Sequence, residues 1–255
     1  MPRLYAHRGA AAEQPEKTLP SFRRALDLGA DALEMDAHLT SDGIVVVSHD
    51  PDGNRMAGVD REIRRSQLSE VQSWDVGRGF VGKGGGRPFS GYRIPTLEEV
   101  LVEFPGVVLN VDVKQEAPDM VLAMLALLRK LRAQERVILA SFSNRTIARL
   151  RQLGYEGPTS LGPAQMIELL LVPRPLLGLL PRRGQAVQIP PRERGIPLAT
   201  RWLIEKCHRL GLRVDYWTIN DPVIARALLA IGADGIMTDD PALIAPVFRE
   251  RATSP

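Results

Sequence analysis

The chain has 255 residues, of which 44% are hydrophobic, and its formal net charge is +3. This size suits one large barrel or two small domains, and we favour a single domain over residues 1–255 because no linker or charge block divides the chain. The near-balance of basic and acidic residues argues against a nucleic-acid partner. The single cysteine, Cys207, excludes an intrachain disulfide, and its helical context indicates a packed residue rather than a nucleophile. Without a signal-peptide pattern or a long apolar run, we expect a cytoplasmic location and no transmembrane segment.

Strand-like and helix-like segments alternate along the chain. A strand at 3–6 precedes a helix at 18–28 and a strand at 32–37. The later segments are a strand at 44–48, a helix from Thr96, a strand at 107–113, a helix at 120–131, a strand at 136–140, a helix at 144–153, short strands at 158–161 and 186–189, a helix at 200–210, a strand at 213–217, a helix at 222–231, a strand at 235–238 and a helix at 241–248. This alternation predicts parallel βαβ units, and their number and the chain length match a (β/α)8 TIM barrel. A doubly wound open sheet is the alternative, disfavoured because no GxGxxG follows the first strand.

Two segments interrupt the alternation. Residues 50–93 are polar, glycine-rich and too long for a simple connection, so we interpret them as a small insertion after the second β/α region. Their glycine run, 82–86, lacks the Gly-Lys-Ser/Thr ending of a phosphate loop, so we favour a flexible loop. Residues 169–180, LLLVPRPLLGLL, are too short to span a bilayer. They are interpreted as buried loop or as an apolar lip beside the site.

Polar side chains gather where the predicted strands end, which is where TIM-barrel active sites lie. These positions are His7-Arg8, Glu34 and Asp36, His49-Asp50, Asp112 and Lys114, Trp217 with Asn220, and Thr238-Asp239. Side chains alternate along a strand, so Glu34 and Asp36 share one face. Three inward carboxylates are costly unless they are paired or bound to metal. We favour a hard cation, Mg²⁺ or Ca²⁺, over a network of salt bridges with Lys114 and Arg8.

The four histidines divide by position. His7 and His49 both stand at predicted strand ends, and two histidines facing one site can act as general base and general acid near neutral pH. His208 lies in a predicted helix and is interpreted as structural. His38 shares the face of Asp36 and is interpreted as structural or as a support behind the metal ligands.

These motifs, in this order, resemble those of the glycerophosphodiester phosphodiesterases over residues 4–241. The shared motifs are His7-Arg8-Gly9, Pro15-Glu16-Lys17-Thr18-Leu19, Glu34-x-Asp36, Thr40-Ser41-Asp42-Gly43, His49-Asp50, Ile94-Pro95-Thr96-Leu97, Asp112-x-Lys114, Ser141-Phe142, Trp217-Thr218-Ile219-Asn220 and Ala233-Asp234-Gly235-Ile236-Met237-Thr238-Asp239. Two positions depart from the family pattern. Lys17 stands where the family usually has asparagine, and Asp112 stands where it usually has glutamate.

The resemblance implies a TIM-barrel enzyme that hydrolyses a small-molecule glycerophosphodiester to sn-glycerol 3-phosphate and an alcohol. The attacking group is either water or the glycerol 2-hydroxyl, which would give a cyclic phosphate that water then opens. The implied residue roles are an acid–base pair of His7 and His49, phosphate contacts from Arg8 and Lys114, a pocket wall from Trp217, and one divalent cation (Mg²⁺, Ca²⁺ or Mn²⁺) held by Glu34, Asp36 and Asp112.

Three alternatives stay open from the sequence. A lysophospholipase D-like or sphingomyelinase D-like lipid phosphodiesterase would use 169–180, which is also the candidate for peripheral membrane contact. A non-catalytic phosphate-sensing barrel would be consistent with the departures at Lys17 and Asp112. A Schiff-base aldolase would use Lys114 as its nucleophile.

Overall fold

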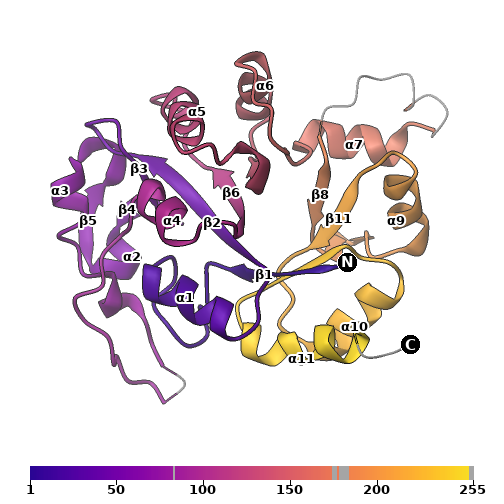
Figure 1. Cartoon of the computed structure of the whole chain (residues 1–255), viewed down its shortest axis with the longest axis horizontal. Helices are drawn as coiled ribbons and strands as arrows, with labels where there is room; N and C mark the ends of the chain where they lie inside the picture. Colours follow the sequence, from indigo (N-terminus) through magenta and orange to yellow (C-terminus); the bar gives the residue numbers. More distant parts are fainter. Residues whose placement is uncertain (83, 174–176, 178–183, 253–255) are drawn as a thin grey trace.

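A computed structural model describes residues 1–82, 84–173, 177 and 184–252 (Figure 1). Seven of its strands form one parallel sheet. These are β1 (Arg3–His7), β2 (Ala32–Leu39), β6 (Val108–Val113), β7 (Val137–Ala140), β8 (Ala186–Ile189), β11 (Arg213–Tyr216) and β12 (Gly235–Thr238). Their order is β7-β6-β2-β1-β12-β11-β8. Residues 159–160 close the ring, because Thr159 bridges Leu139 of β7 and Ser160 bridges Ala186 of β8, both in parallel. The predicted TIM barrel is therefore confirmed.

The barrel helices begin where the sequence supplies capping groups. Thr18 accepts a hydrogen bond from the Ser21 amide, Thr96 forms a capping box with Glu99, and Asp221 accepts from the Val223 amide. The helices are α1 (Leu19–Asp27), α4 (Leu97–Glu103), α5 (Val121–Lys130), α6 (Asn144–Gln152), α7 (Pro163–Leu171), α9 (Arg201–His208), α10 (Pro222–Ala230) and α11 (Pro241–Ala252).

Two apolar layers lie between the helices and the sheet. One layer packs α1, α4, α5 and α6 against β2, β6 and β7, and the other packs α9, α10 and α11 against β8, β11 and β12. Inside the ring, Tyr5, Ala32, Ile138 and Met237 form a smaller cluster. The barrel is thus filled with side chains, and space for substrate is confined to its end.

Helix α7 was not predicted from the sequence. It begins at Pro163, and its last residues, Leu169 to Leu171, belong to the segment interpreted as loop or lip. Leu169 is buried, whereas Leu171 is 77% exposed. Residues 174–176 and 178–183 lie outside the described residues, and they include half of the segment 169–180 that was interpreted as loop or lip. In the described part of the chain, no helix has the length and apolar character needed to cross a membrane.

The predicted strand at 44–48 exists as β3 (Val45–Val47), but the expectation that it is a barrel strand is wrong. It pairs antiparallel with β2, with Ala37 opposite Val47. The physical reason is the short turn before it, in which the Thr40 amide donates to the Ile44 carbonyl. A parallel partner would need a long crossover, and a tight turn can only return the chain antiparallel.

The residues between β3 and α4 carry short elements of their own. These are β4 (Asp52–Gly53), α2 (Asn54–Ala57), β5 (Val59–Glu62) and α3 (Leu68–Val71). Ile63, Val71, Trp74 and Val76 form their apolar core, together with Val46 of β3. We call residues 48–96 the β3–α4 insertion. In Figure 1 it gathers at the side of the barrel near α1 and α4, away from α9, α10 and α11.

Candidate active site

Strand register brings the predicted carboxylates together. His7 of β1 lies opposite Glu34 of β2, and Asp36 of β2 lies opposite Asp112 of β6. We call Glu34, Asp36 and Asp112 the carboxylate cluster. His49 reaches it by another route than predicted: β3 runs back along β2, and the Ser48 amide donates to the Asp36 carbonyl at 3.0 Å.

One ring nitrogen of His7 is held by a carboxylate. Its Nδ1 lies 2.7 Å from Oδ1 of Asp239, and Asn220 donates to the other oxygen of Asp239 at 2.9 Å. Burial would raise the pKa of Asp239, but the hydrogen bonds from His7 and Asn220 outweigh it and lower that pKa. An ionised Asp239 fixes the ring and leaves Nε2 directed at the cluster, 3.9 Å from Glu34.

His49 is held in the same way. Its Nδ1 lies 2.8 Å from Oδ1 of Asp50, and Nε of Arg55 donates to the other oxygen of Asp50 at 2.6 Å. Burial would raise the pKa of Asp50, but its contacts with His49 and Arg55 lower it. Each histidine therefore has an ionised carboxylate at Nδ1 and a second nitrogen for proton transfer.

Arg8 is anchored by Glu34 and Glu16 and keeps one buried donor without a partner in the residues that the structure describes. Its amide donates to Glu34 at 3.0 Å, and its guanidinium donates to Glu16 at 3.3 Å. Arg55 also binds Glu16, at 2.6 Å. Within the described part of the chain, the buried Nε of Arg8 meets no hydrogen-bond acceptor. A buried, unsatisfied donor on a guanidinium is suited to an oxyanion such as phosphate.

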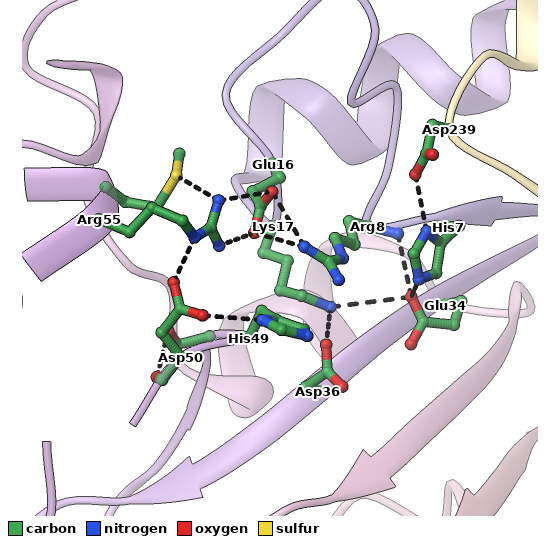
Figure 2. Close-up of polar contacts among 12 residues, drawn as sticks. His7, Arg8, Glu16, Lys17, Glu34, Asp36, His49, Asp50, Arg55 and Asp239 are labelled. Atoms are coloured by element: carbon green, nitrogen blue, oxygen red, sulfur yellow. Dashed lines mark hydrogen bonds and ion pairs between the residues drawn. The ribbon is translucent and has the colours of Figure 1, made fainter. Parts of the chain in front are cut away.

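Two lysines, Lys17 and Lys114, enter the carboxylate cluster. Lys17 forms an ion pair with Oδ2 of Asp36 and lies 3.7 Å from Glu34. Lys114 lies 2.9 Å from Oδ1 of Asp36 and 2.8 Å from Asp112. Figure 2 shows the Lys17 ammonium between Glu34 and Asp36, with His7 on one side and His49 on the other.

The lysines set the ionisation of the cluster. Burial alone would raise the pKa of Asp36, but Lys17 and Lys114 hold it well below its usual range. Burial raises the pKa of Asp112 to about 6, because Lys114 compensates it only in part. Burial acts to lower the pKa of Lys114, yet its two aspartate partners raise it. Asp36 is therefore a firmly charged carboxylate between two ammonium groups.

The donor chemistry of the cluster suits a hard divalent ion, but its arrangement does not. Mg²⁺ and Ca²⁺ need several oxygens within about 2.0–2.6 Å, and both oxygens of Asp36 already contact ammonium groups. Among the described residues, no three acidic, histidine or cysteine side chains are placed to hold a metal ion. The cluster does not fit a divalent ion while Lys17 occupies it, and we assign no step to one.

Trp217 and Phe142 form an aromatic edge beside Lys114. Their rings meet edge to face, 5.9 Å apart, and the Lys114 ammonium lies 5.4 Å from the centre of the Phe142 ring. Phe142 is 66% exposed. The pair can form one wall of an open pocket, the role expected for Trp217, and it adds Phe142 to the candidate site.

The remaining histidines and the cysteine lie as the sequence predicted. His208 pairs with Asp234 at 2.7 Å on the helical layer. His38 is buried, and its Nε2 lies 3.4 Å from the His49 carbonyl, so it supports the loop that carries His49. Burial lowers the pKa of His38. Cys207 is fully buried, and burial raises the pKa of its thiol to about 12, which leaves it unreactive.

Several residues of the site, Phe142 and Lys17 among them, were not predicted as site residues. Asp239 and Asp50 were visible at predicted strand ends, next to residues singled out for other reasons. Glu16 was part of a family motif, but nothing in the sequence indicated that it binds Arg8. Arg55 carried no signal in the sequence, because it lies in α2, a helix of only four residues within the β3–α4 insertion.

Two hollows border residues 16–20, at the loop between β1 and α1. A small hollow is lined by Glu16, Lys17, Ser48, His49 and neighbouring residues of the β3–α4 insertion. A larger cavity of about 210 Å³ lies between the start of α1 and residues 91–95, and none of the predicted site residues lines it. Of the two, the smaller hollow is the one that adjoins His49, a predicted site residue.

Known proteins share both the sequence and the fold. The glycerophosphodiester phosphodiesterase of Caldanaerobacter subterraneus subsp. tengcongensis is 30% identical, over 97% of this chain and 98% of its own length. The structure of the glycerophosphodiester phosphodiesterase from Agrobacterium tumefaciens has a TM-score of 0.80 at 25% identity, covering 96% of this chain and all of that one. A phosphodiesterase from Oleispira antarctica, solved with the product sn-glycerol-3-phosphate, has the same fold, with a TM-score of 0.78 at 24% identity over 98% of this chain and 97% of that one. Residues 7–243 match the model of the glycerophosphoryl diester phosphodiesterase family, and the chain belongs to that family.

Proposed function

We propose that this chain hydrolyses glycerophosphodiesters to sn-glycerol 3-phosphate and an alcohol. The observation that carries the proposal is the matched pair of imidazoles: His7 and His49 each have Nδ1 held by a carboxylate. They lie on either side of a cluster of charged groups (Figure 2). Family membership supports the substrate class, and the product is the one named for the O. antarctica structure.

Phosphate binding is assigned to Arg8 and Lys114. A phosphodiester is an anion, and more negative charge develops on its non-bridging oxygens during the reaction. The Arg8 Nε is a donor without an acceptor in the described chain, and the Lys114 side chain is 27% exposed beside Phe142. Both can meet a phosphate without the loss of an existing hydrogen bond.

Proton transfer is assigned to the histidines. One histidine takes the proton of the attacking hydroxyl as the new phosphorus–oxygen bond forms. The other gives a proton to the alkoxide as the old bond breaks. The attacker is water, or the glycerol 2-hydroxyl followed by opening of a cyclic phosphate, and each route needs one base and one acid.

Glu34, Asp36 and Asp112 are the residues that would hold a divalent ion, and such an ion would neutralise phosphate charge. Binding it would require Lys17 to leave Asp36. A requirement for Mg²⁺, Ca²⁺ or Mn²⁺ therefore stays a prediction from the sequence, and the steps above are written for side chains alone.

The test is a panel of glycerophosphodiesters, with and without each metal, in which release of glycerol 3-phosphate is followed by a coupled assay. Turnover of glycerophosphocholine and related diesters is the expected result. Lysophosphatidylcholine in the same panel tests the lipid phosphodiesterase alternative, and borohydride trapping on Lys114 tests the aldolase alternative. Absence of turnover with every substrate and metal would support a non-catalytic phosphate-binding barrel and contradict the proposal.

A further inference from the structure

Lys17 is fixed in the carboxylate cluster by both its side chain and its backbone. Its side chain is 3% exposed, and its ammonium contacts Asp36 and lies 3.7 Å from Glu34. Its amide donates to the Arg8 carbonyl at 2.9 Å, which ties the loop between β1 and α1 to the end of β1. The ammonium is therefore placed by the fold and is not the end of a freely moving surface side chain.

The backbone of Lys17 has a conformation that lysine rarely adopts. Its φ is +58°, in the left-handed region, where asparagine is enriched among non-glycine residues. Lysine is less favourable than asparagine in this backbone conformation. What lysine contributes is a long, positively charged side chain, and its ammonium group ends at Asp36.

The charges in the cluster are nearly balanced without any ion from solution. Three carboxylates face two ammonium groups, those of Lys17 and Lys114. A divalent ion among the same carboxylates would face two like charges at close range, because Lys17 lies at the oxygens that it would have to share. The free energy that the ion loses on leaving water would therefore be offset only to a small extent by its attraction to the carboxylates.

We propose that the ammonium of Lys17 is a built-in cation that takes the place of a divalent ion in this chain. It holds Glu34 and Asp36 together and cancels the negative charge that would otherwise repel a phosphodiester. The role in substrate turnover rests on the proposed function, but the occupation of the cluster by Lys17 does not.

The first test measures metal binding directly. Wild-type protein and Lys17→Asn are freed of metal with EDTA, dialysed and titrated with MgCl₂, CaCl₂ and MnCl₂ by calorimetry. Lys17→Asn is expected to bind at least one of these ions tenfold or more tighter than wild type, because the competing charge is gone. Asparagine tolerates the left-handed backbone, so the variant should fold, as circular dichroism and thermal melting will check.

A matched control separates local from general effects of charge. Lys130→Asn makes the same change at an exposed lysine, which pairs with Glu98 on the helical layer at 2.6 Å. Its metal affinity should equal that of wild type. Equal affinity of wild type and Lys17→Asn would overturn the proposal. If Lys17→Asn does not fold, the wild-type titration decides: binding of one ion in the micromolar range overturns the proposal, and no such binding supports it.

The second test uses turnover of glycerophosphocholine. Metal-free wild type should keep most of its rate, whereas Lys17→Asn should lose at least tenfold and recover when a divalent ion is added. Loss of the wild-type rate with EDTA and its recovery with metal would overturn the proposal and favour the sequence-based prediction. Absence of turnover in every state would count against the proposed function, and the titrations would still decide the role of Lys17.

Discussion

His7 and His49 come from different structural contexts, one from a barrel strand and one from the end of an antiparallel hairpin. Each nevertheless lies beside the carboxylate cluster and has Nδ1 on an aspartate, Asp239 or Asp50 (Figure 2). A carboxylate at Nδ1 fixes the tautomer and stabilises the ring when it becomes protonated. Both rings can therefore take up or release a proton without reorienting.

Replacing either histidine with alanine should reduce kcat by roughly 10²–10⁴, the usual contribution of a positioned acid or base. Steady-state kinetics on glycerophosphocholine measures this. His208→Ala is the matched control, since His208 pairs with Asp234 away from the site, and its rate should stay near wild type. A substrate with a good leaving group should rescue only the variant that lacks the acid. Near-normal rates in both the His7→Ala and the His49→Ala variant would show that other groups carry out the proton transfer.

At the scale of single residues, the sequence predicted which side chains could take part in the reaction. It did not predict which of them form hydrogen bonds or ion pairs with one another. The alternation of Glu34 and Asp36 on one strand face is a local property, and the structure shows both in the cluster. The pair His7–Asp239 joins residues 232 positions apart, which no local pattern encodes. Arg55 shows the same limit, because its two partners lie on different segments.

At the scale of the elements, the β3–α4 insertion connects the part of the site around His49 with the part around Arg8. Arg55 at its α2 helix binds Asp50, the partner of His49, and Glu16, the partner of Arg8. One planar guanidinium thus holds both carboxylates, in a geometry that lysine cannot copy. The insertion positions the site although it contributes no strand to the barrel.

Arg55→Ala should lower kcat/KM by about 10–100-fold, the usual effect of losing a partner of a site ligand. Arg55→Lys should restore only part of the loss, because it cannot make the forked contact. Arg61→Ala removes an exposed arginine of the same insertion, paired with Glu70, and serves as the control with a normal rate. Wild-type kinetics in a folded Arg55→Ala protein would show that the insertion does not position the site.

Most elements could be predicted from local pattern, and the exceptions have identifiable causes. Strands β8 and β12 begin and end at the predicted residues, because β-branched or apolar runs there are bounded by turn residues. The role of β3 could not be read from its own residues, since a three-residue valine run suits a barrel strand or a hairpin equally. Its partner is decided by the length of the turn before it.

At the scale of the whole molecule, ionisable side chains are buried inside the barrel as well as at the end that carries the candidate active site. Asp215 is fully buried, accepts hydrogen bonds from Tyr5 and Arg213, and has Gly235 beside it. A Cβ atom at Gly235 would collide with the Asp215 carboxylate, so this pairing requires glycine. Burial raises the pKa of Asp215 despite the neighbouring Arg213.

This shift predicts how stability depends on pH. An aspartate with a raised pKa in the folded state is neutral there while the unfolded chain has already ionised near pH 4. The stability that Asp215 contributes is therefore present below about pH 4 and lost as pH rises through the folded pKa. The free energy of unfolding of wild type, minus that of Asp215→Asn, should fall with rising pH in urea titrations. If the difference in unfolding free energy instead grew with pH, the pKa of Asp215 would not be raised in the folded state.

The closure of the ring at residues 159–160 has a consequence for how the barrel opens. β2 and β6 are matched over six residue pairs, whereas the closing segment has one bridge to β7 and one to β8. Cooperative unfolding begins where few backbone hydrogen bonds must break. Amide hydrogen exchange should therefore be fastest at Ser160 and Leu161 among the ring amides and slowest at Leu33 and Val111. The barrel would then open at one weak edge, between β7 and β8, and not uniformly around its circumference.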